Sequence, residues 1–458
     1  MKNMTLEKIA EAVGGKLFGT GEAVKKEVTG VVLDSRQVEE GYLFIATKGE
    51  KVDGHTFIDS VYEKGALGVV SEQELANPKG PYILVEDSFQ ALKDMAEFYR
   101  KQLSVRVIGI TGSVGKTSTK ECIAAALSSK YHVLKTSGNF NNEVGLPLTV
   151  LRIRKEHEVA VLEMGISDFG EMHRLSKIAR PDICVITNIG QCHLENLKTR
   201  DGILKAKSEI FDFMSGNGAI CVNGDDDKLA TLTEVKGIKP VFFGRNSCVQ
   251  VFATDVVNKG LAGSSLVAHR KINDIEDSFT VEIPLPGEHM VYNALAAISV
   301  GTMLGLTSEE LVKGIASVEP VGGRSHIINT DKFIVIDDCY NANPVSMKAA
   351  IDLLSMANTR KVAVLGDMFE LGVKEKALHE EVGIYAAEQK IDCIICTGEL
   401  SECMYKGAKA HATVSQVVYC KDRENLLNQI ESYIKTGDTV LVKASHGMHF
   451  EEVVKRLS

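Results

Sequence analysis

Short apolar runs alternate along the chain with longer segments whose apolar residues recur at helical spacing. Before about residue 103 the apolar runs are VTGVVLDSR, GYLFIAT, LGVVS and YILVE, and the helical pattern SFQALKDMAEFYRKQL follows them. Strands and helices in alternation are typical of an α/β domain. We therefore expect residues 1–103 to form a compact α/β domain with its own core.

The pattern changes at SVRVIGITGSVGKTSTKECIAAAL, which indicates a buried strand, a glycine-rich turn and a long helix. Further strands are expected at VAVLEMG, ICVITNIG and GAICVNGDD, and their helical connections predict a mostly parallel sheet. The polar stretch 246–282 predicts an antiparallel β insertion, and GEHMVYNALAAISVGTMLGL predicts a helix. Together these segments predict a second domain over residues 104–320.

A linker is predicted at SVEPVGGRSH, where Pro320 precedes paired glycines. Four apolar strands interleaved with helical segments follow it, at FIVIDDCY, RKVAVLGDM, CIICTG and DTVLVKAS. This alternation predicts a third domain over residues 321–458, again with an open parallel sheet. The fold class is accordingly α/β, in three domains.

Composition agrees with a globular protein and argues against nucleic acid as the main partner. A chain of 458 residues suits three domains at roughly 150 residues each. Its 61 acidic and 52 basic residues give a formal charge of -9, and no segment concentrates the basic residues. An electrostatic nucleic-acid footprint would need such a segment.

The N-terminus and the cysteines favour a cytoplasmic protein. The segment MKNMTLEKIAEAVGG has helical spacing without a continuous apolar core, so we expect a helix and not a signal peptide. No apolar run approaches the roughly 18 residues of a membrane span, so membrane insertion is not expected. Ten cysteines show no paired framework. The CxxC of Cys393 and Cys396 lies in a strand-like run and indicates buried thiols, with a redox or metal role as the alternative.

The strongest chemical motif is TGSVGKTS, which stands between a buried strand and a helix. Gly112, Gly115, Lys116 and Thr117 in this context predict a phosphate-binding loop, with the lysine on the β- and γ-phosphates and the threonine hydroxyl on Mg²⁺. The strict pattern would have glycine in place of Ile110, so the loop is a variant. The alternative is a glycine-rich turn that exposes a lysine.

Two further polar residues follow predicted strands. Glu163 ends VAVLEMG, and His193 follows ICVITNIG. Open α/β sheets bind ligands at the carboxyl ends of their strands. A carboxylate and an imidazole beside a triphosphate suit a divalent cation, most simply Mg²⁺. Taken singly, Glu163 could be a structural hydrogen-bonding group and His193 a capping or surface residue.

Other polar residues are ordinary by pattern alone. The segment GNFNNEVGLPLT places Asn139, Asn141, Asn142 and Glu143 before a helix start, which is most often turn and cap chemistry. Lys207, in ILKAKSEIF, fits a solvated lysine on a helix surface. Spacing alone therefore predicts no catalytic role for these five residues.

Taken in their order, the motifs resemble the Mur ligase family over essentially the whole chain. The matching segments are DSRQVEEGYLFIATKGEKVDGHTFI, GITGSVGKTSTKE, GNFNNEVGLP, EMGISDFGEM, NIGQCHLENL, AKSEIF, LPGEHMVYNALAA, GGRSH, DDCYNANPVSM, LGDMFELG and VKASHGM. DDCYNANPVSM and LGDMFELG resemble the branch that adds D-alanyl-D-alanine to UDP-N-acetylmuramoyl tripeptide. The resemblance implies a small N-terminal α/β domain for the UDP-sugar substrate, a central P-loop ATPase domain with a parallel sheet, and a C-terminal Rossmann-like domain for the dipeptide.

The resemblance also implies roles for individual residues. The ATP contacts would be Gly112, Ser113, Gly115, Lys116, Thr117, Ser118, Asn293, Arg324 and Asp338. The metal ligands would be Thr117, Glu163, His193 and Lys207, the last through a carbamate, and Lys116, His193 and Lys207 would be catalytic. The substrate contacts would be Asp34, Ser35 and Arg36 for the uridine nucleotide, with Asn142, Tyr340, Asn341 and Asn343 deeper in the cleft. Lys443, Ala444, Ser445 and His446 depart from the expected K-G-S-R, which puts a role for His446 in doubt.

The implied reaction is ATP-dependent amide ligation in the synthesis of a cell-wall precursor, with Mg²⁺ as cofactor and a monomeric enzyme. The tripeptide carboxylate would be phosphorylated and then attacked by the dipeptide amine. A sister ligase that adds lysine or diaminopimelate is the nearest alternative, but the chain lacks the Asp-Asn-Pro-Arg motif of that branch. A P-loop switch or motor and a non-catalytic binding module are the alternatives of other classes.

Overall fold

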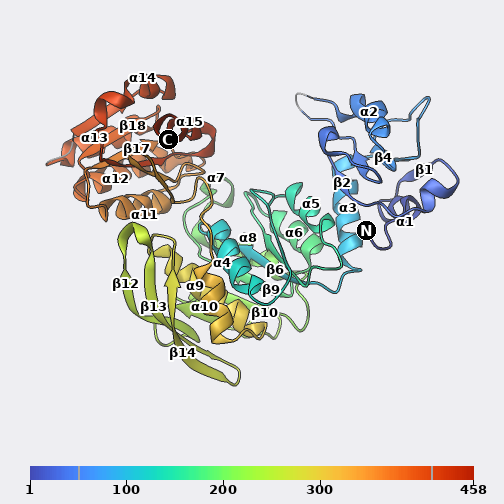
Figure 1. Cartoon of the computed structure of the whole chain (residues 1–458), viewed down its shortest axis with the longest axis horizontal. Coiled ribbons are helices and arrows are strands. Elements are labelled where there is room, and N and C mark those ends of the chain that lie inside the picture. Colours follow the sequence, from blue (N-terminus) through green and yellow to red (C-terminus); the bar gives the residue numbers. More distant parts are fainter. Residues whose placement is uncertain (50–51, 414–415) are drawn as a thin grey trace.

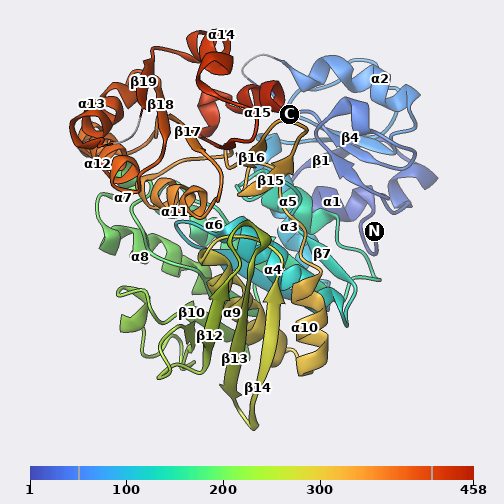
Figure 2. The ribbon, with the colours of Figure 1, turned by 60° about the vertical axis from the view of Figure 1, so that its left-hand side comes forward.

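The computed structural model describes residues 1–49, 52–413 and 416–458, which form three sheets flanked by helices. Figure 1 shows the N-terminal and C-terminal domains on opposite sides of the molecule, each against the central domain. Figure 2 shows the last strands of the central sheet projecting away from both. No helix in the described part of the chain is long and apolar enough to span a membrane.

The N-terminal domain has a five-stranded sheet in the order β1-β5-β4-β3-β2, parallel except for β1. Its strands are β1 (Lys16–Phe18), β2 (Val31–Val32), β3 (Leu43–Ile45), β4 (Gly68–Ser71) and β5 (Tyr82–Leu84). Its helices are α1 (Leu6–Ala12), α2 (Ile58–Glu63), α3 (Ser88–Arg100) and the short 3-10 helices η1 (Glu22–Lys25), η2 (Ser35–Gln37) and η3 (Gly54–Phe57). The four predicted apolar runs are β2 to β5 and the predicted long helix is α3, whereas β1 was not predicted.

Helix α3 attaches this domain to the central one. The Tyr99 hydroxyl donates to the carbonyl of Ile153 at 2.7 Å, and the buried Arg100 guanidinium donates to the carbonyls of Ala179 and Arg180 at 2.8 and 3.0 Å. One apolar cluster of the N-terminal domain continues without a break into the core on one face of the central sheet. We therefore expect the two domains to move together.

Replacing Arg100 with methionine should lower the free energy of unfolding by about 2–4 kcal/mol, because several buried carbonyls lose their donor. Lys101→Met is the matched control, since Lys101 is half exposed and pairs only with Glu97 on the surface. Urea unfolding of both variants followed by circular dichroism would test this. Equal stability of the two variants would contradict a stabilising role for the hydrogen bonds between Arg100 and the central domain.

The central domain has a nine-stranded sheet in the order β14-β13-β12-β11-β10-β9-β6-β8-β7. Its strands are β6 (Arg106–Thr111), β7 (Val133–Lys135), β8 (Val159–Glu163), β9 (Ile183–Ile186), β10 (Ala219–Asn223), β11 (Val241–Gly244), β12 (Val251–Asn258), β13 (Ser264–Ile272) and β14 (Ile275–Ile283). Its helices are α4 (Lys116–Ser128), α5 (Gly145–Leu151), α6 (Glu171–Ala179), α7 (Leu194–Leu197), α8 (Arg200–Ser208), η4 (Glu209–Phe211), η5 (Leu229–Thr231), η6 (Gly260–Ala262), α9 (His289–Met303) and α10 (Ser308–Ala316).

The parallel part of this sheet and its antiparallel extension confirm the predicted organisation. The seven strands β6 to β12 pair in parallel, whereas β13 is antiparallel to both β12 and β14. The predicted insertion is thus continuous with the main sheet. Strands β7 and β11 are short and were not predicted. Register places Glu163 beside Ile110, so the end of β8 lies next to the start of the phosphate-binding loop.

The C-terminal domain has a six-stranded sheet in the order β15-β16-β20-β17-β18-β19, parallel except for β15. Its strands are β15 (His326–Asn329), β16 (Ile334–Asp337), β17 (Lys361–Gly366), β18 (Cys393–Thr397), β19 (Gln416–Cys420) and β20 (Thr439–Lys443). Its helices are α11 (Pro344–Ser355), η7 (Gly372–Lys374), α12 (Glu375–Glu388), α13 (Ser401–His411), α14 (Arg423–Tyr433), η8 (His446–Met448) and α15 (Glu451–Leu457).

This domain has apolar clusters of its own on both faces of its sheet, and Leu261 is the central-domain side chain that packs against them. The predicted four-strand parallel arrangement is confirmed, and the predicted linker lies between α10 and β15. Cys393 and Cys396 are buried in β18, and burial raises the pKa of the Cys393 thiol to about 11. A separate core and a linker without regular structure allow this domain to move against the other two.

Candidate active site

The phosphate-binding loop connects β6 to α4, and its two glycines have left-handed backbones. Gly112 has φ +153°, and a Cβ there would lie 1.9 Å from Thr187 Oγ1, so only glycine fits. Gly115 has φ +79° and precedes the first residue of α4. The Lys116 ammonium curls back to donate to the Gly112 carbonyl at 3.0 Å. The loop is therefore wound as a phosphate cradle with its lysine over the opening.

The loop that follows β9 supports this cradle. The amides of Ser113 and Val114 donate to the main-chain carbonyl and side-chain oxygen of Asn188, both at 3.0 Å. The Ser113 hydroxyl accepts from the amide of Gly190 at 2.8 Å, and the Thr187 hydroxyl donates to the Val114 carbonyl at 2.7 Å. The two loops thus hold each other in place, a support that no motif or spacing in the chain predicted.

Glu163 is buried at the end of β8 with one of its two carboxylate oxygens unsatisfied. Its Oε1 accepts from the Asn141 amide at 2.8 Å and from the Thr117 hydroxyl at 3.2 Å. Its Oε2 makes no hydrogen bond with any described residue, and the Lys120 ammonium lies 3.9 Å from it. An ionised oxygen left without a partner in the interior is costly unless a ligand completes it.

Lys120 is a buried cation that sequence reasoning missed. It lies one helical turn after Lys116 on α4 and is almost fully inaccessible. Its ammonium donates to the Thr136 carbonyl at 2.8 Å and lies 3.1 Å from Glu121. Its charge therefore offsets part of the negative charge that Glu163 brings into the interior.

Glu163 and Thr117 together fit a divalent cation. Glu163, Thr117 and the phosphate cradle line one cavity, the buried Oε2 of Glu163 has no hydrogen-bond partner among the described residues, and oxygen donors of this kind suit Mg²⁺. Within residues 1–49, 52–413 and 416–458, no cluster of three His, Cys, Asp or Glu side chains could hold a metal by itself. The site thus fits a cation that takes most of its ligands from phosphate and water.

Helix α9 contributes three polar side chains to the same cavity. His289, Tyr292 and Asn293 stand at positions i, i+3 and i+4, so they share one face of an otherwise apolar helix. The buried Asn293 accepts from the Thr119 hydroxyl at 2.8 Å, which joins α9 to α4. Burial and the nearby carboxylate of Asp225 raise the pKa of Tyr292 to about 12. Only Asn293 had been predicted, although the spacing could have identified the other two.

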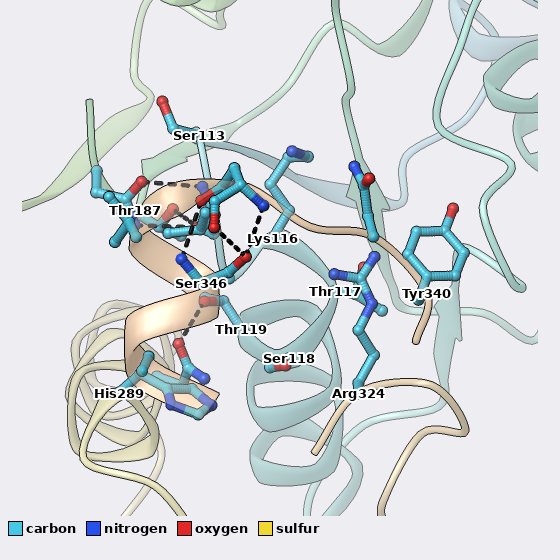
Figure 3. A pocket seen from close by; sticks show the side chains of 18 of the residues that line it. Ser113, Lys116, Thr117, Ser118, Thr119, Thr187, His289, Arg324, Tyr340 and Ser346 are labelled. Atoms are coloured by element: carbon cyan, nitrogen blue, oxygen red, sulfur yellow. Dashed lines mark hydrogen bonds between the residues drawn. The ribbon is translucent and has the colours of Figure 1, made fainter. Parts of the chain in front are cut away.

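The C-terminal domain faces the cradle with charged and aromatic side chains. The Arg324 guanidinium stacks over the ring of Tyr340 at 4.0 Å, and Figure 3 shows both beside α4. Asp338 accepts from the buried Lys443 ammonium at 2.5 Å and from the Ser325 amide at 2.9 Å. The His446 ring centroid lies 5.4 Å from that of Tyr340. No carboxylate or carbonyl among the described residues pairs with the Arg324 guanidinium, so its donors can meet an anion, whereas Asp338 is already paired.

The asparagines have mainly local roles. Asn142 accepts from the amide of Gly145 at 2.9 Å, and Asn343 caps α11 by accepting from the amide of Ser346 at 2.9 Å. Asn341 accepts from the Lys443 ammonium through its main-chain carbonyl at 3.1 Å. The turn and cap interpretation of Asn142 is confirmed. All three asparagines nevertheless line the cavity, so capping does not exclude ligand contact.

His193 and Lys207 lie near the cradle in different environments. His193 lines the cavity and its Nδ1 lies 2.7 Å from Glu370 Oε2, on the C-terminal domain. Lys207 is fully buried in α8, so the interpretation as a solvated surface lysine is wrong: α8 turns this side chain into the protein. Burial, together with a smaller contribution from the charge of Lys116, lowers the pKa of Lys207 to about 8.

Asp34, Ser35 and Arg36 lie apart from this cavity, on the N-terminal domain after β2. Asp34 pairs with the exposed Arg36 at 2.7 Å, and this contact lowers the pKa of Asp34 to about 2. The structure therefore does not bring these three residues together with the phosphate cradle.

A cavity of about 960 Å³ joins the remaining predicted residues. Its walls come from the central and the C-terminal domains. The predicted residues that line it are Ser113, Gly115, Lys116, Thr117, Ser118, Asn142, Glu163, His193, Asn293, Arg324, Asp338, Tyr340, Asn341 and Asn343. Gly112, which belongs to the cradle, and the buried Lys207 are predicted residues that are not among those lining the cavity.

Comparisons with known proteins match all three domains. Residues 27–100 match the family described as Mur ligase family, catalytic domain, residues 110–301 match the Mur ligase middle domain, and residues 323–446 match the Mur ligase, glutamate ligase domain. The UDP-N-acetylmuramoyl-tripeptide–D-alanyl-D-alanine ligase of Bacillus subtilis is 39% identical and that of Escherichia coli 33%, each over 100% of this chain and 99% of the relative.

Solved structures agree with these matches. A crystal structure of MurF from Acinetobacter baumannii has a TM-score of 0.88 at 33% identity, covering 99% of this chain and 98% of that one. MurF ligase from Thermotoga maritima in complex with ADP has a TM-score of 0.80 at 32% identity, covering 93% and 96%. Since relatives this similar extend over the whole length, and the phosphate cradle, its carboxylate and all three domains are present, the chain belongs to the Mur ligase family.

Proposed function

We propose that this chain is an ATP-dependent ligase that joins D-alanyl-D-alanine to the terminal carboxylate of UDP-N-acetylmuramoyl tripeptide. The observation that carries the proposal is the single cavity between the phosphate cradle and the C-terminal domain, because a ligase must bring a phosphoryl donor and an amine acceptor together. The curated relatives that match the whole chain carry this activity in their names. The implied setting is peptidoglycan precursor synthesis in the cytoplasm by a monomeric enzyme.

The three domains divide the substrates. Residues 1–103 hold the UDP-sugar, with Asp34, Ser35 and Arg36 on the uridine nucleotide. Residues 104–320 hold ATP on the cradle, and residues 321–458 hold the dipeptide. Helix α3 makes the first two domains one unit, which supports a fixed distance between the UDP-sugar and ATP. The separate core of the third domain supports its closing over the bound substrates and excluding water from the intermediate.

In the first step the tripeptide carboxylate attacks the γ-phosphorus of ATP, giving an acyl phosphate and ADP. Lys116 and the amides of the cradle bind the phosphate oxygens, and Arg324 approaches from the third domain. Thr117 and Glu163 would hold Mg²⁺, which neutralises charge on the phosphates when bound. Asn293 and its neighbours on α9 form the nucleoside side of the cavity.

In the second step the dipeptide amine attacks the acyl carbon. The C–N bond of the amide forms, the bond between the acyl carbon and the phosphate oxygen breaks, and inorganic phosphate leaves. Tyr340, Asn341 and Asn343 are placed to orient the dipeptide from the C-terminal side. The positive charge of Lys116 and Arg324 favours the oxyanion that develops on the acyl oxygen. His193 would hold a second divalent cation. The cradle and its charges thus serve both steps.

The decisive test measures phosphate release from ATP with the purified protein, UDP-N-acetylmuramoyl tripeptide and D-alanyl-D-alanine, omitting each component in turn. Phosphate should be released only with all three present, together with a pentapeptide product detected by mass spectrometry. Release that continues without the dipeptide would remove the ligase proposal and favour a P-loop switch or motor. A lysine or diaminopimelate amine accepted in place of the dipeptide would favour a sister ligase.

Lys207→Arg should lower kcat by about 10–100-fold although arginine keeps the positive charge, since we propose that Lys207 acts as a carbamate. An amine whose pKa is lowered to about 8 by burial is partly neutral near physiological pH, and only the neutral amine attacks carbon dioxide. Turnover with and without added bicarbonate is the measurement, and Lys205→Arg on the same helix is the control. Full activity of the Lys207 variant would reduce this side chain to a structural role.

A further inference from the structure

The central and C-terminal domains are joined by few polar contacts. Between residues 104–320 and the described part of 321–458, the contact of His193 with Glu370 is the one ion pair, at 2.7 Å from Nδ1 to Oε2. Asn258 adds a donation to the Met356 sulfur at 3.2 Å. Figures 1 and 2 agree that α7, which begins after His193, lies beside the C-terminal domain. An ion pair across an interface that can open exists only when the two domains are docked, so it can make the properties of its residues depend on docking.

Both partners have a left-handed backbone conformation, which residues other than glycine rarely adopt. His193 has φ +50° and Glu370 has φ +61°. Such outliers persist only where the surroundings hold them, and they gather at functional sites. Two of them meeting side chain to side chain across a domain boundary indicates a contact with a function beyond packing.

The segment that presents Glu370 is rigid. The amide of Met368 donates to Nε2 of the buried His379 at 2.9 Å, and the amide of Phe369 donates to the Ser445 hydroxyl at 2.9 Å. Leu371, on the other side of Glu370, is buried. Glu370 itself has a largely exposed side chain. The carboxylate therefore moves as part of the C-terminal domain and meets His193 only where that domain is docked.

The contact determines which imidazole nitrogen remains for a ligand. An ionised carboxylate only accepts hydrogen bonds, so Nδ1 of His193 carries the proton and donates to Glu370. Neutral imidazole then keeps its lone pair on Nε2. Because His193 lines the cavity, this nitrogen is the one available there. Histidines that bind metals generally donate their other ring proton to a carboxylate or carbonyl, which fixes the ring and raises its basicity.

We infer that Glu370 is a positioning residue that the C-terminal domain supplies to His193, so that the second cation site becomes complete only when this domain docks. The inference rests on the proposed function in one respect, namely that His193 holds a divalent cation. By thermodynamic linkage, a contact that favours cation binding in the docked arrangement must also make the cation favour docking. Loading of the site and closure of the domain would then occur together.

The test is Mn²⁺ binding by the full-length protein, measured by electron paramagnetic resonance with a non-hydrolysable ATP analogue present. The wild type should bind a second Mn²⁺. Glu370→Gln should weaken that second site about 10–100-fold and leave the first unchanged, because glutamine is similar in shape but a poorer acceptor. Glu388→Gln, on an exposed face of α12 in the same domain, is the matched control and should bind as the wild type does.

His193→Ala separates this inference from the proposed role of His193. If His193→Ala weakens the second site and Glu370→Gln does not, the inference is overturned while the histidine keeps its role. If His193→Ala leaves the second site intact, both the role and the inference fall. Loss of the second site in both variants, with the first site retained, supports the inference, because general unfolding would remove both sites.

Discussion

Replacing Lys116 with methionine is expected to lower ligase turnover by at least about 10³-fold. The Lys116 ammonium stands over the cradle and donates to the Gly112 carbonyl, so it is placed to meet the phosphates of a bound nucleotide. Phosphoryl transfer depends on positioning and on charge neutralisation more than on covalent help, and loss of one such donor alone costs about 10²–10³-fold. Methionine keeps much of the side-chain volume while it removes the charge.

Initial rates of phosphate release at saturating ATP, with nucleotide affinity measured by calorimetry, would separate weaker binding from slower chemistry. Lys130→Met is the control, because Lys130 lies on the surface just beyond α4 and contacts α10 through Glu310. The variants should share one circular dichroism spectrum. Near-normal turnover of Lys116→Met would show that the loop is a structural turn and would remove the nucleotide site from the proposal.

The architecture was largely predictable because the spacing of apolar residues along the chain differs between strands and helices. Buried parallel strands form continuous apolar runs, and β6, β8, β9 and β10 are all of this kind. The strands that were missed all have partly exposed positions, so none of them is a continuous buried run; they are β1, β7, β11, β15 and β19. Their identity depends on neighbours in the sheet, which local sequence does not contain.

The site was predictable where chemistry follows directly from a strand end, and not where it depends on tertiary contacts. Glu163 could be identified because it terminates an apolar strand. Lys207 and Lys120 could not, because a lysine on a helix is ordinarily solvated and only the packed structure shows that both are buried. For Lys207, burial shows that the surface position predicted from periodicity is wrong, whereas the carbamate that the resemblance implies stays a prediction.

Contacts between residues far apart in the sequence cannot be predicted from the spacing of residues in local motifs. His193 and Glu370 are far apart in the chain and meet only through the placement of two domains. Likewise Asp338, which the resemblance implies as a nucleotide contact, accepts a hydrogen bond from Lys443 on β20, a strand that comes about 100 residues later in the chain. Whether a carboxylate in this cavity can bind a ligand thus depends on its partners in the folded protein, which local sequence does not show.

Glu163→Gln should lower turnover by about 10²–10³-fold and raise the Mg²⁺ concentration needed for half-maximal activity. Glutamine has nearly the same shape, so the contacts with Asn141 and Thr117 change little in geometry, but the negative charge on the unsatisfied Oε2 is lost. A hard divalent cation prefers a carboxylate oxygen to an amide oxygen. The buried Lys120 ammonium would then keep only Glu121 as a compensating charge and would repel a cation that enters more strongly.

The matched control is Glu121→Gln, because Glu121 also contacts Lys120, at 3.1 Å, but does not line the main cavity. If the loss in Glu163→Gln came only from an uncompensated lysine, both variants would lose activity alike. If the unsatisfied oxygen binds a cation, only Glu163→Gln should shift the Mg²⁺ dependence, and Mn²⁺ binding in the presence of nucleotide should weaken in that variant alone. An unchanged Mg²⁺ dependence in Glu163→Gln would leave the carboxylate as a partner of Thr117 and Asn141 with no role in holding metal.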